Sequence, residues 1–404
     1  MTLQIETAAF AQVGPPRSIA GRIVARALRT LEAGQLRVVL PNGETVSHAA
    51  VSPGPDITLV VRRWRALWRM LRGGEHGFSD GYLDGEWTTP DLGQLLRLCI
   101  LNERAIGRRN SGSAFTRLRN RIFHRSRDNT ARGSRRNISA HYDLGNAFYE
   151  QWLDVGMNYS SALYRGDETL EAAQLVKLDR AAELLDLSGG ERILEIGCGW
   201  GALAERLIDR YRASVDGLTL SVEQLAYCKE RLMGRSFAGR LQDYRNETGR
   251  YDRIVSVEML EAVGERFWST YFAKLRECLA TTGVAVLQVI TIREDRYESY
   301  RSHPDFIQRH IFPGGMLPTP AIIEREAGRQ GLRLVHHESF GPCYARTLAE
   351  WRVRFMRAWP AIEALGFDAR FRRMWEYYLT YCEVGFSSGL INVGFFKLIP
   401  RASR

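Results

Sequence analysis

The stretch ILEIGCGWG, residues 193–201, ends an apolar run in closely spaced glycines. Gly197 and Gly199 permit a tight turn and let a ligand approach the backbone. Such turns also suit dinucleotides, but the next apolar run ends at Thr219 and not at the acid that binds a ribose hydroxyl. Glu195 is typical of sites that orient the amino acid portion of S-adenosylmethionine. We therefore predict an S-adenosylmethionine site rather than a nicotinamide site, with a turn used only for packing as the remaining alternative.

The pattern around this turn alternates between buried-strand runs and helical segments. The predicted strands are RILEIG, SVDGLTL, DRIVSVE and GVAVLQVITI, and helical stretches such as ALAERLIDRY and VEQLAYCKERL lie between them. This alternation predicts an α/β domain with a parallel sheet flanked by helices, whose ligands bind at the carboxyl ends of the strands. We expect the domain to span residues 137–404.

Residues 1–103 are predicted to form a smaller α+β domain. GQLRVVLPNGETVSH alternates like a hairpin around Asn42-Gly43, and RRWRALWRMLRGG has the period of a helix that ends at Gly73-Gly74. Residues 104–136 hold eleven arginines and one acid, so the net charge of this segment equals the net charge of +10 of the whole chain. The segment is predicted to be a linker.

The charge and composition restrict the partners. The arginine-rich segment and the Trp/Arg helix at 62–72 suit anionic lipid, with a solvated linker and a packed helix as the alternative. No nucleic-acid motif accompanies the charge, so we expect no nucleic acid. The six cysteines form no Cys-x-x-Cys pair, which predicts reduced thiols and no metal site.

No run approaches the roughly 20 apolar residues of a membrane span, and the first residues lack the pattern of a secretory signal. We expect a cytoplasmic protein that attaches peripherally to the inner face of the membrane. The oligomeric state stays open, a homodimer included.

Longer stretches of the sequence resemble the cyclopropane-fatty-acyl-phospholipid synthase family. The similarity covers about residues 60–400, and it implies a Rossmann-like class I methyltransferase domain with a mostly parallel sheet. The small N-terminal domain also resembles the N-terminal domain of bacterial members of the family. That domain is faintly similar to sterol-carrier folds. The stretches that carry the resemblance are HYDLGNAFYEQWLDVGMNYSSALY (141–164), GLTLSVEQ (217–224), SVEMLEAVG (256–264), DFIQRHIFPGGMLPT (305–319), GPCYARTLAEW (341–351) and RMWEYYLTYCEVGFSSG (373–389).

The resemblance implies that the sulfonium methyl of S-adenosylmethionine moves to the cis double bond of a phospholipid acyl chain. The methyl group then loses a proton with the help of a bicarbonate ion, and a cyclopropane ring closes. An alkene is a poor nucleophile, so this reaction needs close positioning and a dry site. Aromatic faces can stabilise the carbocation, with ordinary core packing as the alternative for each ring. The candidate rings are Tyr142, Phe148, Tyr149, Trp152, Tyr159, Tyr164, Phe306 and Phe312.

The resemblance also implies two sets of site residues. The cofactor set is Tyr159, Ser160, Glu195, Gly197, Gly199, Thr219, Gln224, Gln242 and Asp243, the last two beside the adenine. The bicarbonate set is Ser161, Glu261, Gln288, Tyr344 and the backbone of Ile290. In this set Glu261 would accept the hydrogen of the ion, and Tyr344 would donate a hydrogen bond or relay the proton. The alternatives are a Glu261 paired with an arginine and a Tyr344 packed under the C-terminal helices.

The chain departs from the bacterial pattern at three positions, two of which belong to the bicarbonate set. Ser161 replaces a usual Cys, Gln288 replaces a His, although plant-like members carry Gln there, and Ala262 replaces a common His. Ser and Gln still donate hydrogen bonds to an anion. A base placed elsewhere would permit a hydride shift and a different proton loss.

We expect a cyclopropane product, with a methyl-branched or methylene-bearing unsaturated chain as the alternative. Two other functions stay open. One is an N-methyltransferase for a small amine, and the other is a lipid-binding protein that has lost catalysis.

Overall fold

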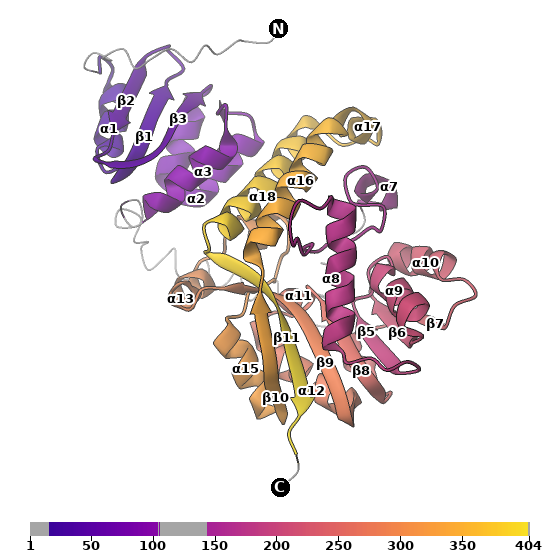
Figure 1. Cartoon of the computed structure of the whole chain (residues 1–404). Helices are drawn as coiled ribbons and strands as arrows, with labels where there is room; N and C mark the ends of the chain where they lie inside the picture. The colour runs from indigo at the N-terminus through magenta and orange to yellow at the C-terminus, as the bar shows by residue number, and fades with distance from the viewer. Residues whose placement is uncertain (1–15, 104, 106–143, 403–404) are drawn as a thin grey trace. The chain divides into compact units, whose positions relative to one another are not determined.

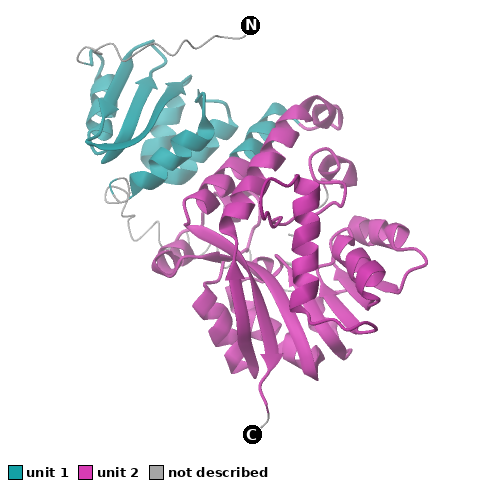
Figure 2. Ribbon diagram, in the orientation of Figure 1, with its two compact units in different colours: residues 1–113, 368–377 teal, residues 114–367, 378–404 magenta. Residues whose placement is uncertain are grey.

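The computed structural model describes residues 16–103, 105 and 144–402 (Figure 1). Its contacts divide the chain into two compact units, Met1–Ser113 with Asp368–Tyr377, and Ala114–Phe367 with Tyr378–Arg404 (Figure 2). A short C-terminal segment thus belongs to the N-terminal unit. The predicted linker at 104–136 lies outside the described residues apart from Ala105, and so does Tyr142.

The first unit contains a four-stranded sheet of order β2-β1-β3-β4. Strands β1 and β2 are antiparallel and flank the predicted Asn42-Gly43 turn, β1 and β3 are parallel, and β3 and β4 are antiparallel. The predicted helix after Arg62 does not stop at Gly73-Gly74: the chain kinks at Gly74, where φ is 53°, and helical structure continues. The strands and helices are β1 (Ala33–Val39), β2 (Thr45–Ala49), β3 (Ser52–Val61), β4 (Trp87–Thr88), α1 (Ile19–Leu28), α2 (Trp64–Leu83) and α3 (Leu92–Leu101).

The second unit contains a seven-stranded sheet of order β10-β11-β9-β8-β5-β6-β7. Strands β7, β6, β5, β8 and β9 are parallel, and β11 is antiparallel to both β9 and β10. All four predicted strands occur, as β5, β6, β8 and β9. The bounds are β5 (Arg192–Ile196), β6 (Ser214–Thr219), β7 (Phe237–Leu241), β8 (Tyr251–Val257), β9 (Leu279–Ile292), β10 (Leu332–Ser339) and β11 (Ile391–Pro400).

The order of the strands reverses beside β5. The chain runs outward from β5 through β6 to β7 and then returns to β8 on the other side of β5. Loops that leave neighbouring strands in opposite directions create a crevice at their carboxyl ends, where ligands of such sheets bind. By this rule we expect a ligand to bind beyond Ile196 of β5 and Val257 of β8.

Helices cover both faces of this sheet (Figure 1). One core packs Leu194, Ile254 and Leu287 of the strands against Phe272 and Leu275 of α12, and α15 completes the cluster. The helices of the second unit are α7 (Asn146–Tyr149), α8 (Leu170–Leu184), α9 (Ala202–Tyr211), α10 (Val222–Arg231), α11 (Leu260–Val263), α12 (Trp268–Cys278), α13 (Glu294–Ser302), α14 (Phe306–His310), α15 (Pro320–Arg329), α16 (Gly341–Arg357) and α17 (Trp359–Ala364), with short 3-10 turns η1 (Tyr244–Asn246) and η2 (Glu265–Phe267). The last helix, α18 (Ala369–Ser387), begins in the first unit and ends in the second.

Candidate active site

The glycine turn between β5 and α9 is open on one side and packed on the other. The N–H groups of Gly197 and Cys198 donate to the carbonyl oxygen of Leu218 at 2.9 and 3.0 Å, which ties the turn to β6. A Cβ added to Gly199, where φ is +52°, would meet no atom within 4 Å, whereas one added to Gly201 would lie 3.1 Å from a thiol sulfur. The backbone at Gly199 therefore faces space that a ligand can enter.

Glu195 leads into this turn as a buried carboxyl group. The side chain is 3% exposed, and its Oε2 atom has no hydrogen-bond partner. Burial raises the pKa of Glu195 well above its ordinary value, and the nearby Lys177 ammonium opposes this shift. A buried polar atom without a partner normally signals a missing ligand or strain, so Glu195 is suited to a polar group of a cofactor.

Lys177 is a site residue that the sequence did not suggest. It lies on α8 with almost no exposure, and its Nζ donates to Ser160 Oγ at 2.9 Å. Burial lowers the pKa of Lys177 to about 8, and the carboxylates of Glu258, Asp154 and Glu195 oppose that shift. The lysine therefore remains a cation at neutral pH. Its only sequence signal was a charged residue on the apolar face of a helical segment.

The remaining predicted cofactor residues follow β6 and β7. Thr219 Oγ1 donates to Gln224 Oε1 at 2.9 Å, and both side chains are buried. Gln242 donates through its backbone to the Thr219 carbonyl oxygen at 3.1 Å. Its side chain donates to Glu247, while Asp243 pairs with Arg245 at 2.6 Å. The structure thus brings these residues to one edge of the sheet, and the side chains of Gln242 and Asp243 already have partners there.

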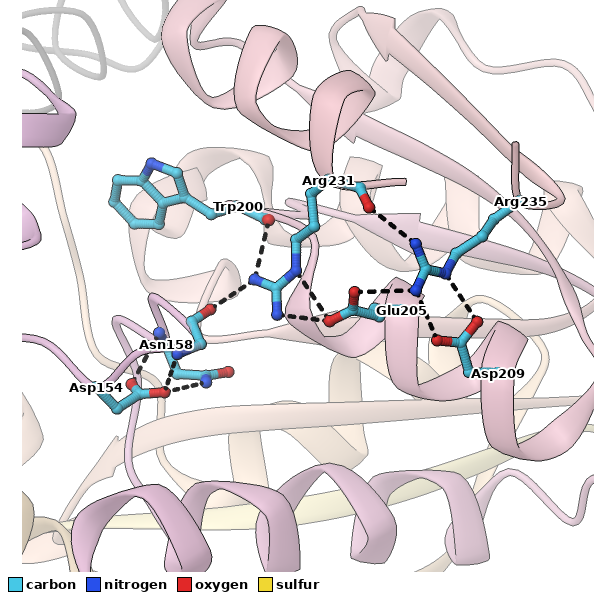
Figure 3. A network of polar contacts seen from close by, with 8 residues as sticks. Asp154, Asn158, Trp200, Glu205, Asp209, Arg231 and Arg235 are labelled. Carbon is cyan, nitrogen blue, oxygen red and sulfur yellow. Dashed lines mark hydrogen bonds and ion pairs between the residues drawn. The ribbon is translucent and has the colours of Figure 1, made fainter. Parts of the chain in front are cut away.

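A polar network fastens the glycine turn to the segment that carries Tyr159, Ser160 and Ser161 (Figure 3). Arg231 Nη1 donates to the Gly156 carbonyl oxygen at 2.9 Å and to the Trp200 carbonyl oxygen at 3.5 Å. The same guanidinium donates to Glu205 Oε2 at 2.7 Å. One guanidinium group thus contacts Gly156, Trp200 and Glu205, and these contacts fix the relative position of the two segments.

A second glutamate, Glu258, gathers most of the residues predicted to hold bicarbonate. Its Oε1 accepts from the Ser161 backbone N–H at 2.8 Å and from Gln288 Nε2 at 2.8 Å. Its Oε2 accepts from the Tyr344 hydroxyl at 2.7 Å. The Ser161 hydroxyl does not take part and donates to the Ala162 carbonyl oxygen. The sequence interpretation missed Glu258, although SVEMLEAVG places two glutamates three residues apart after a buried strand.

Glu261 has different surroundings from Glu258. The Ile290 N–H donates to Glu261 Oε1, and Oε2 is buried without a hydrogen-bond partner. Burial raises the pKa of Glu261 to about 8, and the negative charge of Glu258 adds to this shift. No arginine pairs with Glu261 among the ion pairs of the described residues. At neutral pH Glu261 is therefore mostly a neutral acid.

Burial raises the pKa of both Tyr344 and Glu258, and the hydrogen bond between them acts on the two pKa values in opposite directions. Burial raises the pKa of the Tyr344 hydroxyl well above its ordinary value, so this group stays a hydrogen-bond donor. Burial raises the pKa of Glu258 as well, but the donors Tyr344, Ser161 and Gln288 and the Lys177 charge lower it. Such donors favour an ionised carboxylate.

Aromatic side chains surround Tyr159. The centroid of its ring lies 5.4 Å from that of Tyr149, 5.6 Å from that of Trp152 and 5.5 Å from that of Trp351. Its hydroxyl lies 2.9 Å from the hydroxyl of Tyr378. These five residues form a wall that we name the aromatic wall.

The other candidate rings have varied neighbours. The Phe148 ring contacts two members of the aromatic wall, Tyr149 and Trp152, and the Phe312 ring lies 6.4 Å from that of Tyr378. Phe306 packs beside Tyr381. Two candidates therefore adjoin the aromatic wall, whereas Phe306 packs against a ring outside it.

Tyr164 is the remaining described candidate ring. The centroid of its ring lies 4.0 Å from the guanidinium carbon of Arg346, so its face is engaged by a cation of the protein itself.

The sheet order and the glycine turn after the first parallel strand define a class I methyltransferase fold. The family model described as Mycolic acid cyclopropane synthetase matches residues 129–396, and the chain belongs to this family of S-adenosylmethionine-dependent fatty acyl methyltransferases. The small N-terminal α+β unit accompanies that fold.

Individual relatives agree with this assignment. The chain is 38% identical to tuberculostearic acid methyltransferase UfaA1 of Mycobacterium tuberculosis, over 96% of this chain and 93% of the relative. It is 34% identical to cyclopropane-fatty-acyl-phospholipid synthase of Escherichia coli, over 79% of this chain and 81% of the relative. A solved structure of mycolic acid cyclopropane synthase CmaA1 complexed with SAH and CTAB is 31% identical, with a TM-score of 0.62, and covers 65% of this chain and 97% of that one.

No group of three or more His, Cys, Asp or Glu side chains is placed to hold a metal ion in the described part of the chain. None of the described helices combines the length and apolar character that a membrane span requires.

Proposed function

We propose that the enzyme methylates the cis double bond of an unsaturated phospholipid acyl chain, and that its product is a methyl-branched or methylene-bearing chain. The observation that supports this product is the position of Glu258, whose carboxylate accepts hydrogen bonds from three of the five residues that the resemblance assigns to bicarbonate. The name of the relative that matches along nearly the whole chain, a tuberculostearic acid methyltransferase, supports this product over the cyclopropane ring.

The residues around the glycine turn fit S-adenosylmethionine. Gly199 leaves the backbone open, and the unpartnered Glu195 Oε2 can accept a hydrogen bond from an ammonium group. The Lys177 cation donates to Ser160 Oγ, so its charge would attract the carboxylate of an S-adenosylmethionine molecule bound beside Ser160. When bound, S-adenosylmethionine supplies an electrophilic methyl group on a positively charged sulfur. Glu195, Gly197, Gly199, Thr219 and Gln224 would hold it.

The aromatic wall provides the surroundings that a carbocation needs. Tyr149, Trp152 and Trp351 are fully buried and present π faces and edges around Tyr159. Such faces attract positive charge, by about 2 kcal/mol or more where water is excluded. A carbocation formed on the acyl chain beside this wall is therefore stabilised by the rings.

The position of the base bears on the product. A carboxylate fixed to the backbone reaches fewer positions than a small ion held by the same donors. The carbocation then persists long enough for the neighbouring hydride to migrate from the methyl-bearing carbon. Loss of a proton from the new methyl group after this shift leaves a methylene group, whereas loss before the shift closes a ring.

The test uses labelled S-adenosylmethionine and liposomes of unsaturated phospholipid. Both products gain one CH₂ unit, so mass alone does not separate them. Ozonolysis does, because it cleaves the double bond that only the methylene product retains. We expect labelled lipid that ozone cleaves at the methylated carbon. Ozone-resistant labelled lipid would indicate the cyclopropane, and label found only in added small amines would indicate an N-methyltransferase.

The exposed face of α2 in the first unit is our candidate for lipid contact. Trp64 is 42% exposed, Trp68 61% and Leu71 59%. Arg72 lies over the Trp68 ring at 5.5 Å, whereas Arg69 is engaged by Asp84. Exposed indole rings with a neighbouring cation suit the boundary between lipid headgroups and acyl chains.

Vesicle sedimentation tests this surface. Trp68→Ser is expected to weaken binding to anionic vesicles several-fold, and Val51→Ser, at an exposed apolar residue on the same unit, is expected to leave it unchanged. Binding should also weaken with salt, because each cation near anionic lipid contributes about 1 kcal/mol that ions screen. Equal effects of the two substitutions would argue against a role for α2.

A further inference from the structure

We propose that Glu258 is the proton acceptor of this methyltransferase and takes the place of the bicarbonate ion that the family resemblance implies. The inference rests on the proposed lipid methylation and assigns its last step to a side chain of this protein. It derives from the convergence of three donors on one carboxylate, from the backbone that holds it, and from the charges around it.

The donors that converge on Glu258 come from three separate parts of the chain. The Ser161 N–H and Gln288 Nε2 bind one carboxylate oxygen, each at 2.8 Å, and the Tyr344 hydroxyl binds the other at 2.7 Å. All three residues belong to the set that the sequence resemblance assigned to bicarbonate, although Ser161 donates through its backbone N–H and not through its hydroxyl. An added bicarbonate would find its donors occupied and a negative charge already present, so the ion does not fit this site.

The backbone shows that the carboxylate is held at a cost. Glu258 has a φ of 50°, in the left-handed region that suits glycine, and a side chain there costs about 1–2 kcal/mol. The backbone of Glu258 is held in place by a hydrogen bond, because its N–H donates to the Gln288 carbonyl oxygen at 2.8 Å. A strained residue that keeps a buried carboxylate is typical of a functional site.

The charges of the surrounding groups make Glu258 the available base. Glu261, which lies one helical turn away, holds its proton at neutral pH, and Tyr344 stays a neutral donor. Lys177 is a cation whose field favours an anion at Glu258. Among the described residues, Glu258 Oε2 accepts a single hydrogen bond, from Tyr344, so this oxygen keeps a lone pair that can take a proton. This division of two nearby carboxyl groups into an acid and a base follows from their different hydrogen bonds.

The proton transfer balances in atoms and charge. The ionised carboxylate of Glu258 forms an O–H bond with a proton of the newly added methyl group. After the hydride shift the cationic carbon is the one that bears the new methyl group, so the electron pair of the broken C–H bond forms a carbon–carbon double bond between these two carbons. A cation and an anion thereby become a neutral lipid and a neutral carboxylic acid, which later returns its proton to water.

The experiment compares the full-length enzyme and three variants in buffer freed of carbon dioxide. Glu258→Gln removes the base but keeps the shape, and Glu258→Gly removes the side chain at a φ that glycine adopts without strain. Glu277→Gln, at an exposed glutamate on α12, is the matched control. Lipid labelling measures turnover, and calorimetric titration with SAH reports whether the cofactor site is intact.

We expect wild-type and Glu277→Gln turnover to be independent of added bicarbonate. Glu258→Gln should lose roughly 10²- to 10⁴-fold in turnover, the usual contribution of a general base, while SAH affinity changes less than about threefold. In Glu258→Gly the three donors are released, so formate or bicarbonate should restore turnover by roughly tenfold or more.

Three results would overturn the assignment. These are a wild-type enzyme that requires bicarbonate, a Glu258→Gln variant with near wild-type turnover, and a Glu258→Gly variant that binds SAH normally but is not rescued by either anion. The absence of labelled lipid with wild-type enzyme, at normal SAH affinity, would instead refute the proposed lipid methylation and the role of Glu258 with it.

Discussion

Replacement of Glu261 by glutamine tests the charge state on which the site chemistry depends. Burial and the Glu258 charge raise the pKa of Glu261 to about 8 from an unfolded value of 4.5. The folded protein thus binds one more proton than the unfolded chain between these two values, and its stability falls as the pH rises through that window. Glutamine does not titrate and still offers an oxygen to the Ile290 N–H.

The size of the effect follows from linkage. With these pKa values, Glu261 reduces the free energy of unfolding by about 1 kcal/mol at pH 5 and about 4 kcal/mol at pH 8. Partial exposure of Glu261 screens some of this. We therefore expect the stability of Glu261→Gln relative to wild type to increase by about 2–3 kcal/mol between pH 5 and pH 8.

The assay is differential scanning calorimetry of the full chain. The Tm is taken from the unfolding transition that shifts when SAH is added, because that transition belongs to the unit that binds the cofactor. For a unit of this size, 1 kcal/mol corresponds to about 2 °C, so the difference in Tm should grow by about 4–6 °C. Glu277→Gln, at an exposed carboxylate, should follow the wild-type pH profile. A Tm difference for Glu261→Gln that does not change with pH would mean that Glu261 is ionised in the folded state, and the division into acid and base would fail.

Three further predictions concern the cofactor site. Glu195→Gln should weaken SAH binding roughly 10- to 100-fold, because a hydrogen bond to a charged group contributes about 1.5–3 kcal/mol; an unchanged Kd in calorimetric titration would remove Glu195 from the site. Gly199→Ala should lose SAH affinity and lower the Tm slightly, through its positive φ alone, whereas Gly201→Ala adds a contact of 3.1 Å between the new Cβ and a sulfur and should lower the Tm further in thermal denaturation. Arg231→Lys, which cannot keep its two-point contact with Glu205, should weaken SAH binding several-fold in the same titration, and unaltered affinity would show that the network does not position the turn.

The local features of this protein were readable from its sequence. Strand and helix periods in the second unit, and the glycine turn after ILEI, depend on neighbouring residues, and the corresponding strands β5, β6, β8 and β9 occur. The α2 helix illustrates the limit of local signals. Gly73-Gly74 predicts a helix end, but packing lets the chain kink at Gly74 and continue as helix to Leu83.

The sequence by itself determined the fold class, the family and the residue types available for chemistry. Only the tertiary structure decided that Ser161, Gln288 and Tyr344 converge on Glu258, and that Lys177 lies buried beside the cofactor residues. The physical reason is that these contacts join residues far apart in the chain. Their meeting depends on strand order and helix packing, which no local period encodes, and burial then sets which carboxyl group keeps its proton.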